Sequence, residues 1–174
     1  MKQPHSIFYP LITGADNPLL RRISDPVTAF DREIQTFSDI LLELMYEYDG
    51  IGLAAPQLGE ALRMIAVTEW KERKEKKGKN GKLKVHRSII GEYVMINPVL
   101  LEHSTQTQIT EEACLSLPRL FGEVERYAWV KVSYFDPQGN AHTKKLQGFN
   151  AVVVQHEMDH LEGILFTDKL IEPL

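Results

Sequence analysis

The chain has a single cysteine and no long hydrophobic run. With Cys114 alone, no disulfide can form within the chain, so a fold held by internal disulfides is excluded. No apolar stretch approaches the roughly 20 residues that a membrane-spanning helix needs. Residues 1–8 also lack the continuous apolar segment of a signal peptide and the Arg- and Ser-rich composition of a transit peptide. We therefore expect a cytoplasmic protein.

The composition is that of an ordinary globular domain, but its charge is unevenly distributed. The chain has 174 residues, of which 43% are hydrophobic and 25% charged, and we expect one domain over residues 1–174. The segment Lys71 to Arg87 contains seven Lys and two Arg against two Glu, a net charge of +7, so the rest of the chain carries −11 of the total of −4. Nucleic-acid contact is one interpretation of this basic segment. Because the segment has no aromatic residue for base stacking, a solvated loop is the alternative.

Apolar periodicity predicts two helices and several strands. Apolar residues recur at helical spacing over residues 30–48, with Gly50 as the expected C-terminal cap, and a second helix is expected over about 149–161. Asn80-Gly81 predicts the turn of a long hairpin within the basic segment. We expect strands at 62–70, 92–101, 127–135 and 141–146. These elements show no βα alternation, so the fold class is α+β, with mixed or antiparallel strands around a central metal-binding helix and a second long helix near the N-terminus.

The motif His-Glu-x-x-His lies at residues 156–160. On a helix, positions i and i+4 share a face, so His156 and His160 can bind one metal ion. Glu157 follows the first ligand, where its carboxylate can act as a general base toward water on the metal. The alternative is a buried helix with two incidental histidines.

Two histidines do not complete a metal site, and Cys114 is the natural third ligand. A thiolate and two imidazoles suit tetrahedral Zn²⁺ or Fe²⁺ and leave the fourth position for water. An open position indicates catalysis, because the metal lowers the pKa of its water and generates hydroxide near neutral pH. The remaining histidines lie outside any motif and are expected at the surface: His5, His86, His103 and His142.

The chain resembles the peptide deformylase family. Three motifs carry the resemblance: Gly50 to Gln57 matches Gly-Φ-Gly-Φ-Ala-Ala-x-Gln, where Φ is apolar, Glu112 to Ser116 matches Glu-Gly-Cys-Φ-Ser with one change, and Gln155 to His160 matches Gln-His-Glu-x-Asp-His. The N-terminal arm, from Asn17 to Val27, is also similar. The resemblance covers essentially the whole chain except the basic segment.

The resemblance implies an activity and a role for each matching residue. Family members remove the formyl group from the N-terminal formyl-methionine of new polypeptides, through a hydroxide on one divalent metal, usually Fe²⁺ in the cell and often Zn²⁺ or Ni²⁺ after purification. Carried onto this chain, Glu157 is the general acid and base, and Gln57 with the backbone N–H of Leu115 forms the oxyanion hole. The implied metal ligands are Cys114, His156 and His160, and the implied substrate-binding residues are Gly50, Ile51, Gly52, Ala113, Val152 and Val153. Pairing of Arg126 with an acidic group near the site is a further expectation.

Two departures from the family pattern set further expectations. Ala113 replaces the family glycine beside Cys114, and at a positive φ it would cost about 1 kcal/mol or more, whereas at a negative φ only a methyl group would intrude. We expect altered substrate binding with the metal retained.

In addition, only eleven residues follow Gly163, where many bacterial members continue into a helix that docks on the ribosome. We expect the segment Lys71–Arg87 to contact ribosomal RNA instead.

Three other functions stay open at this point. A paralogue would keep the metal site but act on another N-acyl or amide substrate. The replacement of the family glycine by Ala113 is the observation that suggests it. A metalloprotease would usually have His or Glu as the third ligand in place of Cys114. A nucleic-acid-binding module would use the basic segment together with a structural metal.

Overall fold

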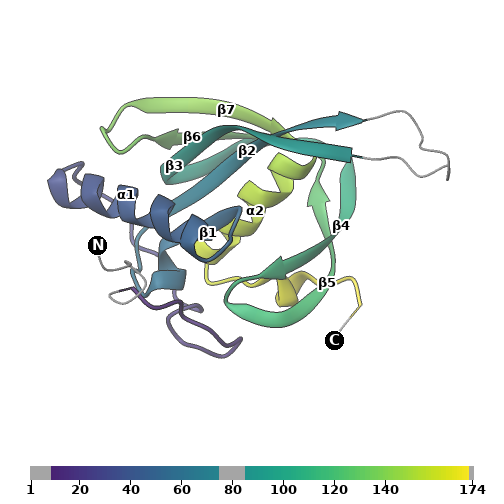
Figure 1. Cartoon of the computed structure of the whole chain (residues 1–174), viewed down its shortest axis with the longest axis horizontal. Coiled ribbons are helices and arrows are strands. Elements are labelled where there is room, and N and C mark those ends of the chain that lie inside the picture. Colours follow the sequence, from purple (N-terminus) through teal and green to yellow (C-terminus); the bar gives the residue numbers. More distant parts are fainter. Residues whose placement is uncertain (1–8, 75–84, 173–174) are drawn as a thin grey trace.

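The protein has an α+β fold with two antiparallel sheets, as its sequence predicts (Figure 1). Its structure is a computed structural model that describes residues 9–74 and 85–172. Five strands form one sheet in the order β1-β2-β3-β6-β7, and β4 pairs with β5 in a separate hairpin. The elements are α1 (Arg32–Glu47), β1 (Gly52–Ala54), the 3₁₀ turn η2 (Ala55–Leu58), β2 (Met64–Lys74), β3 (Val85–His103), β4 (Thr107–Cys114), β5 (Leu117–Tyr127), β6 (Trp129–Phe135), β7 (Ala141–Gln147), α2 (Phe149–Leu161) and the 3₁₀ turn η3 (Phe166–Lys169).

The first helix, α1, begins where the sequence predicts but ends differently. Asp31 caps its N-terminus, because the carboxylate accepts a hydrogen bond from Ile34 N at 3.0 Å. At the C-terminus, Asp49 adopts the left-handed conformation with φ 57°, and Gly50 N donates to Met45 O at 2.7 Å. The prediction that Gly50 is the cap was therefore wrong. Gly50 occupies the following position of a Schellman motif, where no positive φ is needed.

The predicted hairpin is present and longer than expected. β2 and β3 pair in antiparallel register from Met64↔Ile96 to Lys74↔Val85, with one irregularity between Glu69 and Trp70. Residues 71–74 and 85–87 of the basic segment are thus paired strand rather than loop. Residues 75–84, including the predicted Asn80-Gly81 turn, lie outside the described residues.

The stretch around Cys114 is the end of a strand. β4 ends at Cys114 and β5 begins at Leu117, so the hairpin turns immediately after the cysteine. The strand predicted over 127–135 was misplaced at its start, because Tyr127 ends β5 and β6 begins at Trp129.

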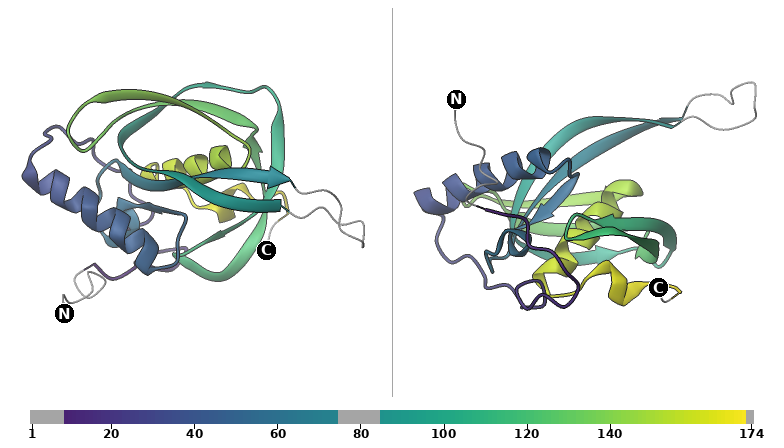
Figure 2. Two further views of the ribbon diagram at one scale, coloured as in Figure 1. Left: turned by 45° about the horizontal axis from the view of Figure 1, so that its top comes forward. Right: turned by 60° about the horizontal axis from the view of Figure 1, so that its bottom comes forward.

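The second helix, α2, lies between the large sheet and the β4–β5 hairpin (Figures 1 and 2). It contacts β1, β2, β5 and β7, and most of its side chains are buried. A helix that is covered on several sides needs apolar residues on several of its faces. The core residues contributed by α2 to the packing against the sheet are Ala151, Val153, Val154 and Leu161. None of the helices among residues 9–74 and 85–172 has the length and apolar character that crossing a bilayer requires.

Candidate metal centre

The structure brings Cys114, His156 and His160 together. One potential ligand atom from each residue lies within 4.8 Å of the others, and all three side chains are buried. His156 and His160 are one turn apart on α2, while Cys114 arrives from the end of β4, with its Sγ 3.3 Å from His160 Nε2. Ligands of a tetrahedral Zn²⁺ or Fe²⁺ with bonds of about 2.0–2.3 Å stand about 3.5 Å apart. The donor set and its spacing therefore fit one ion.

Glu112 fixes the orientation of His156. Its Oε2 accepts a hydrogen bond from His156 Nδ1 at 2.7 Å, which leaves Nε2 as the nitrogen available to a metal. Burial opposes the charged form of Glu112, but Arg126 and His156 outweigh it and lower the pKa of this carboxyl to about 2. Burial likewise opposes protonation of His156, and contacts with Cys114 and Glu112 raise its pKa to about 10. Burial and the charge of His156 lower the pKa of His160.

Arg126 binds Glu112, the hydrogen-bond partner of His156, in agreement with the expected pairing of Arg126 with an acidic group. Its guanidinium binds Glu112 through two hydrogen bonds, of 2.7 and 2.9 Å, and Asp159 through a third of 2.5 Å. Lys169 binds the other oxygen of Asp159 at 2.6 Å. A buried ion network of this kind orients a ligand and is costly to disrupt, because each remaining charge would lose its partner.

Glu157 points into the same site. Burial, with the nearby carboxylates of Glu112 and Asp159, raises its pKa to about 7, although the charge of His156 opposes the shift. Its Oε2 is buried without a hydrogen-bond partner among the described residues, so it is free to bind water or substrate. Gly52 makes room for this carboxylate, because a Cβ at that position would overlap Glu157 Oε1.

Gln57 is held beside Cys114 by hydrogen bonds at both ends of its amide. Its Oε1 accepts from Ala54 N at 2.8 Å, and its Nε2 donates to Ser116 Oγ at 3.0 Å and lies 3.6 Å from Cys114 Sγ. Leu115 lies between Cys114 and Ser116 in the hairpin turn and packs against the core that contains α1. The sequence did not assign a role to Ser116, although it lies in the quoted motif.

A cleft of about 480 Å³ connects these groups. Every site residue predicted from sequence lines it except His160, which is 1% exposed. Its other lining residues include five with no predicted role in the site: Asp49, Thr110, Glu111, Pro118 and Phe149. Thr110 and Glu111 are consecutive residues of β4 and Phe149 begins α2, so their place in the cleft follows from the packing of those two elements.

Ala113 lines the cleft without backbone strain. It is not among the non-glycine residues with positive φ, which in the described chain are Asp49, Asn97 and Arg119. Of the two cases considered for this position, the structure therefore selects the second, in which only a methyl group intrudes.

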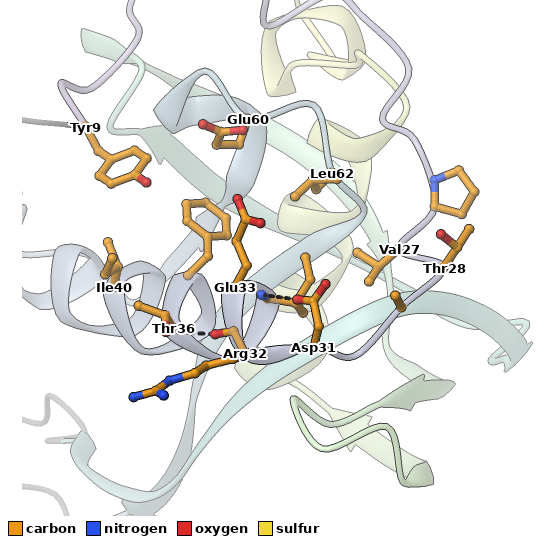
Figure 3. Close-up of a pocket in the computed structure, with 14 residues that line it drawn as sticks. Tyr9, Val27, Thr28, Asp31, Arg32, Glu33, Thr36, Ile40, Glu60 and Leu62 are labelled. Carbon is orange, nitrogen blue, oxygen red and sulfur yellow. Dashed lines mark hydrogen bonds between the residues drawn. The ribbon is translucent and has the colours of Figure 1, made fainter.

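A second cavity, of about 660 Å³, lies away from these groups, between α1 and the N-terminal arm (Figure 3). Its lining residues include Tyr9, Arg32, Glu33 and Glu60. It contains none of the site residues predicted from sequence.

The buried His-Glu-x-x-His helix with a cysteine donor and an open cleft defines a metal-dependent hydrolase. The family model described as polypeptide deformylase matches residues 10–173. A peptide deformylase from Brucella suis is 38% identical over 161 residues, which are 92% of this chain and 83% of that protein. The chain belongs to the peptide deformylase family.

Solved structures of that family have the same fold. The peptide deformylase from Thermotoga maritima matches with a TM-score of 0.78 at 36% identity, over 94% of this chain and 98% of the other. A structure of the Acinetobacter baumannii class I type b enzyme with bound Met-Ala-Ser matches with a TM-score of 0.79 at 35% identity, over 92% of this chain and 97% of the other.

Proposed function

We propose that this protein removes the formyl group from the N-terminal formyl-methionine of nascent polypeptides, acting as a single catalytic domain over residues 1–174. The observation that carries the proposal is the convergence of Cys114, His156 and His160 with Glu157 in one cleft of a peptide deformylase fold. Family membership favours this reaction over a paralogue with another acyl substrate and over a metalloprotease.

Cys114, His156 and His160 hold one divalent ion, so that α2 is the metal-binding helix around which the strands pack. Fe²⁺ is the expected native ion, and Zn²⁺ and Ni²⁺ suit the same donors. The bound ion supplies Lewis-acid chemistry, which lowers the pKa of water and polarises the formyl oxygen. Glu112 keeps the Nε2 of His156 directed at the ion, and Arg126 holds Glu112 in place.

Glu157 moves the proton. Its raised pKa, about 7, lets it accept a proton from the attacking water near neutral pH and return it to the leaving amine nitrogen. Water adds to the formyl carbon, the carbon–nitrogen bond breaks, and formate and a free amino group result. Gln57 Nε2 and the Leu115 N–H stabilise the negative charge that develops on the formyl oxygen.

The substrate lies along the cleft wall formed by Gly50, Ile51 and Gly52, with its backbone added to the edge of β1. Val152 and Val153 line the pocket for the methionine side chain. The methyl group of Ala113 narrows the facing wall, so we expect Ala113→Gly to raise kcat/KM about two- to fivefold, mainly by lowering KM, while the metal content stays the same. An unchanged kcat/KM would show that the methyl group does not affect the substrate.

The basic segment Lys71–Arg87 contacts ribosomal RNA, which would bring the enzyme to its nascent substrates in the cytoplasm. Its excess of Lys and Arg supports this role, and such binding weakens steeply as salt concentration rises. Ribosome sedimentation at increasing salt, with the segment deleted in a control protein, tests this contact. Salt-insensitive binding, or binding unchanged by the deletion, would contradict it.

The decisive test is anaerobic turnover of formyl-Met-Ala by protein loaded with Fe²⁺ or Ni²⁺. We expect turnover that falls about 10²- to 10⁴-fold in Glu157→Ala, with one metal ion still bound per chain. Acetyl-Met-Ala serves as the comparison substrate. Preference for the acetyl peptide, or no turnover by the fully loaded protein, would overturn the proposal in favour of the paralogue.

A further inference from the structure

A series of hydrogen bonds links the start of α2 to the wall of the cleft. The Asn150 side chain binds the backbone of Trp70 in both directions, accepting from Trp70 N at 2.9 Å and donating to Trp70 O at 2.8 Å. The indole of Trp70 donates to Thr68 Oγ1 at 2.7 Å, and that hydroxyl donates to the carbonyl oxygen of Ile51 at 2.8 Å. Thr68 N donates to the same carbonyl at 3.0 Å.

This series begins at α2 and ends at Ile51, whose neighbour Gly52 also contacts α2. Ile51 is followed by Gly52, and Gly52 lies so close to Glu157 that no side chain fits between them. Asn150 and Glu157 are about two turns apart on the helix. The strand edge is therefore held in direct contact with α2 at Gly52 and indirectly through Trp70 and Thr68.

The sheet itself is irregular at this point. The pairing of β2 with β3 shifts between Glu69 and Trp70, at the residue whose backbone Asn150 binds. Such irregularities often redirect a side chain beside an active site. Thr68 is 3% exposed, so water cannot readily replace its hydroxyl as partner of the Ile51 carbonyl. A valine of the same shape would remove one donor from that carbonyl and the acceptor of the Trp70 indole.

We propose that Thr68 and Trp70 are positioning residues that fix the Ile51–Gly52 peptide, and with it the wall along which the substrate backbone binds. The inference rests on the proposed function, in which this wall binds substrate. Neither residue lines the cleft or lies in the three motifs, so their effect must pass through Ile51.

The test compares Thr68→Val with Thr68→Ser, which keeps the hydroxyl. In Thr68→Val we expect the KM for formyl-Met-Ala-Ser and the Kd of the product Met-Ala-Ser each to rise about fivefold, the effect of one lost hydrogen bond, while kcat changes less than about twofold. Thr68→Ser should restore both constants. Thr36→Val is the matched control, because it removes a threonine hydroxyl that donates to the Arg32 carbonyl at 2.7 Å in α1, away from the cleft.

A purely structural role for Thr68 would lower Tm and leave KM and Kd unchanged, and that outcome would overturn the inference. Equal values for the Val and Ser variants would also overturn it. If Thr68→Val does not fold, Trp70→Phe is the second variant: it removes the indole donor together with part of the ring and keeps the Thr68 hydroxyl. It should raise Kd about twofold, and an unchanged Kd would contradict the proposal. Failure of the wild-type protein to hydrolyse the formyl peptide would instead refute the proposed function, since the Kd comparison does not depend on turnover.

Discussion

Glu112 connects the proposed metal ligand His156 to the buried Arg126, so its charge should affect metal affinity. In Glu112→Gln the shape of the side chain is kept, but the hydrogen bonds to His156 Nδ1 and Arg126 lose their negative acceptor. We expect metal affinity to fall about 10- to 100-fold, as for other residues that orient a metal-ligating histidine. Competition with a chromogenic chelator measures this affinity directly.

Glu123→Gln is a suitable control for that measurement. It makes the same change on β5, in the strand that pairs with β4, at an exposed position that does not line the cleft. Equal metal affinity in Glu112→Gln and Glu123→Gln would show that the orientation of His156 does not depend on the charge of Glu112.

The sequence predicted a set of residues that the structure brings together in one cleft, but it did not predict the residues around them. His156, Glu157 and His160 were predictable because helical spacing alone places them on one turn of α2. Cys114 could be added because it is the chain's single cysteine. Phe149 and Thr110 could not be found in this way, since their place in the cleft depends on how α2 and β4 pack, and Asp49 lies outside the three motifs.

At the level of elements, the end of α1 carries a strained residue that can be relieved. Asp49 has φ 57°, a conformation that costs an L-residue with a side chain about 1 kcal/mol and costs glycine little. We expect Asp49→Gly to raise the free energy of unfolding by about 0.5–1 kcal/mol, measured by urea denaturation. Asp39→Gly, the same substitution in the interior of α1, should lower it by about 1 kcal/mol. A loss of stability in both variants would contradict the assigned role of Asp49.

The turn between β6 and β7 depends on one carboxylate. Asp136 accepts hydrogen bonds from Gln138 N and Asn140 N at 3.0 and 2.9 Å, and His142 Nε2 lies 2.7 Å from its Oδ2. Burial opposes ionisation, but these bonds outweigh it and lower the pKa of Asp136 to about 2. A lowered pKa in the folded state stabilises the protein above the unfolded pKa of about 3.9, and the stabilisation is lost as pH falls toward 2.

Comparison with Asp136→Asn isolates this contribution, because other carboxyl groups titrate alike in both proteins. We expect the wild type to be more stable by about 1 kcal/mol at pH 7 and the difference to shrink as the pH falls below about 4. Urea denaturation across this range measures both curves. A difference that does not change with pH would indicate that the charge of Asp136 does not stabilise the turn.

The bounds of a helix or strand were predictable where the type of residue changes abruptly along the sequence, and not elsewhere. The expected bounds of α2 were correct, because an apolar run follows Gly148 and ends before Gly163. The strand expected over 127–135 began two residues too early, since Ala128 between β5 and β6 carries no turn signal. The capping of α1 was assigned to Gly50 because glycine favours positive φ, but the hydrogen bonds of the helix end place that conformation one residue earlier, at Asp49.

At the scale of the whole molecule, the charge of the cleft should select among substrates. Asp49 lines it from the end of α1 and Glu111 from β4, both exposed, and no Lys or Arg is found among the described residues that line it. Glu123 stands directly opposite Glu111 in the hairpin, which adds to the negative potential. Glu111 is three residues from Cys114 along β4, about 10 Å, so the second and third residues of a bound peptide would pass these carboxylates.

We therefore expect formyl-Met-Ala-Lys to be hydrolysed with a kcat/KM about tenfold above that of formyl-Met-Ala-Glu at low ionic strength, because each peptide charge interacts with two rim carboxylates through water. The ratio should approach one as ionic strength rises to about 0.5 M, where the Debye length falls to a few ångströms. Combining Asp49→Asn with Glu111→Gln should remove most of the preference, whereas Asp39→Asn, which deletes an equivalent charge on the exposed face of α1, should leave it intact. A preference for the Lys peptide that persists at high salt and in the double variant would contradict this prediction. Such a preference would come from the shape of the cleft, because an electrostatic preference is weakened by salt and by removal of the two carboxylates.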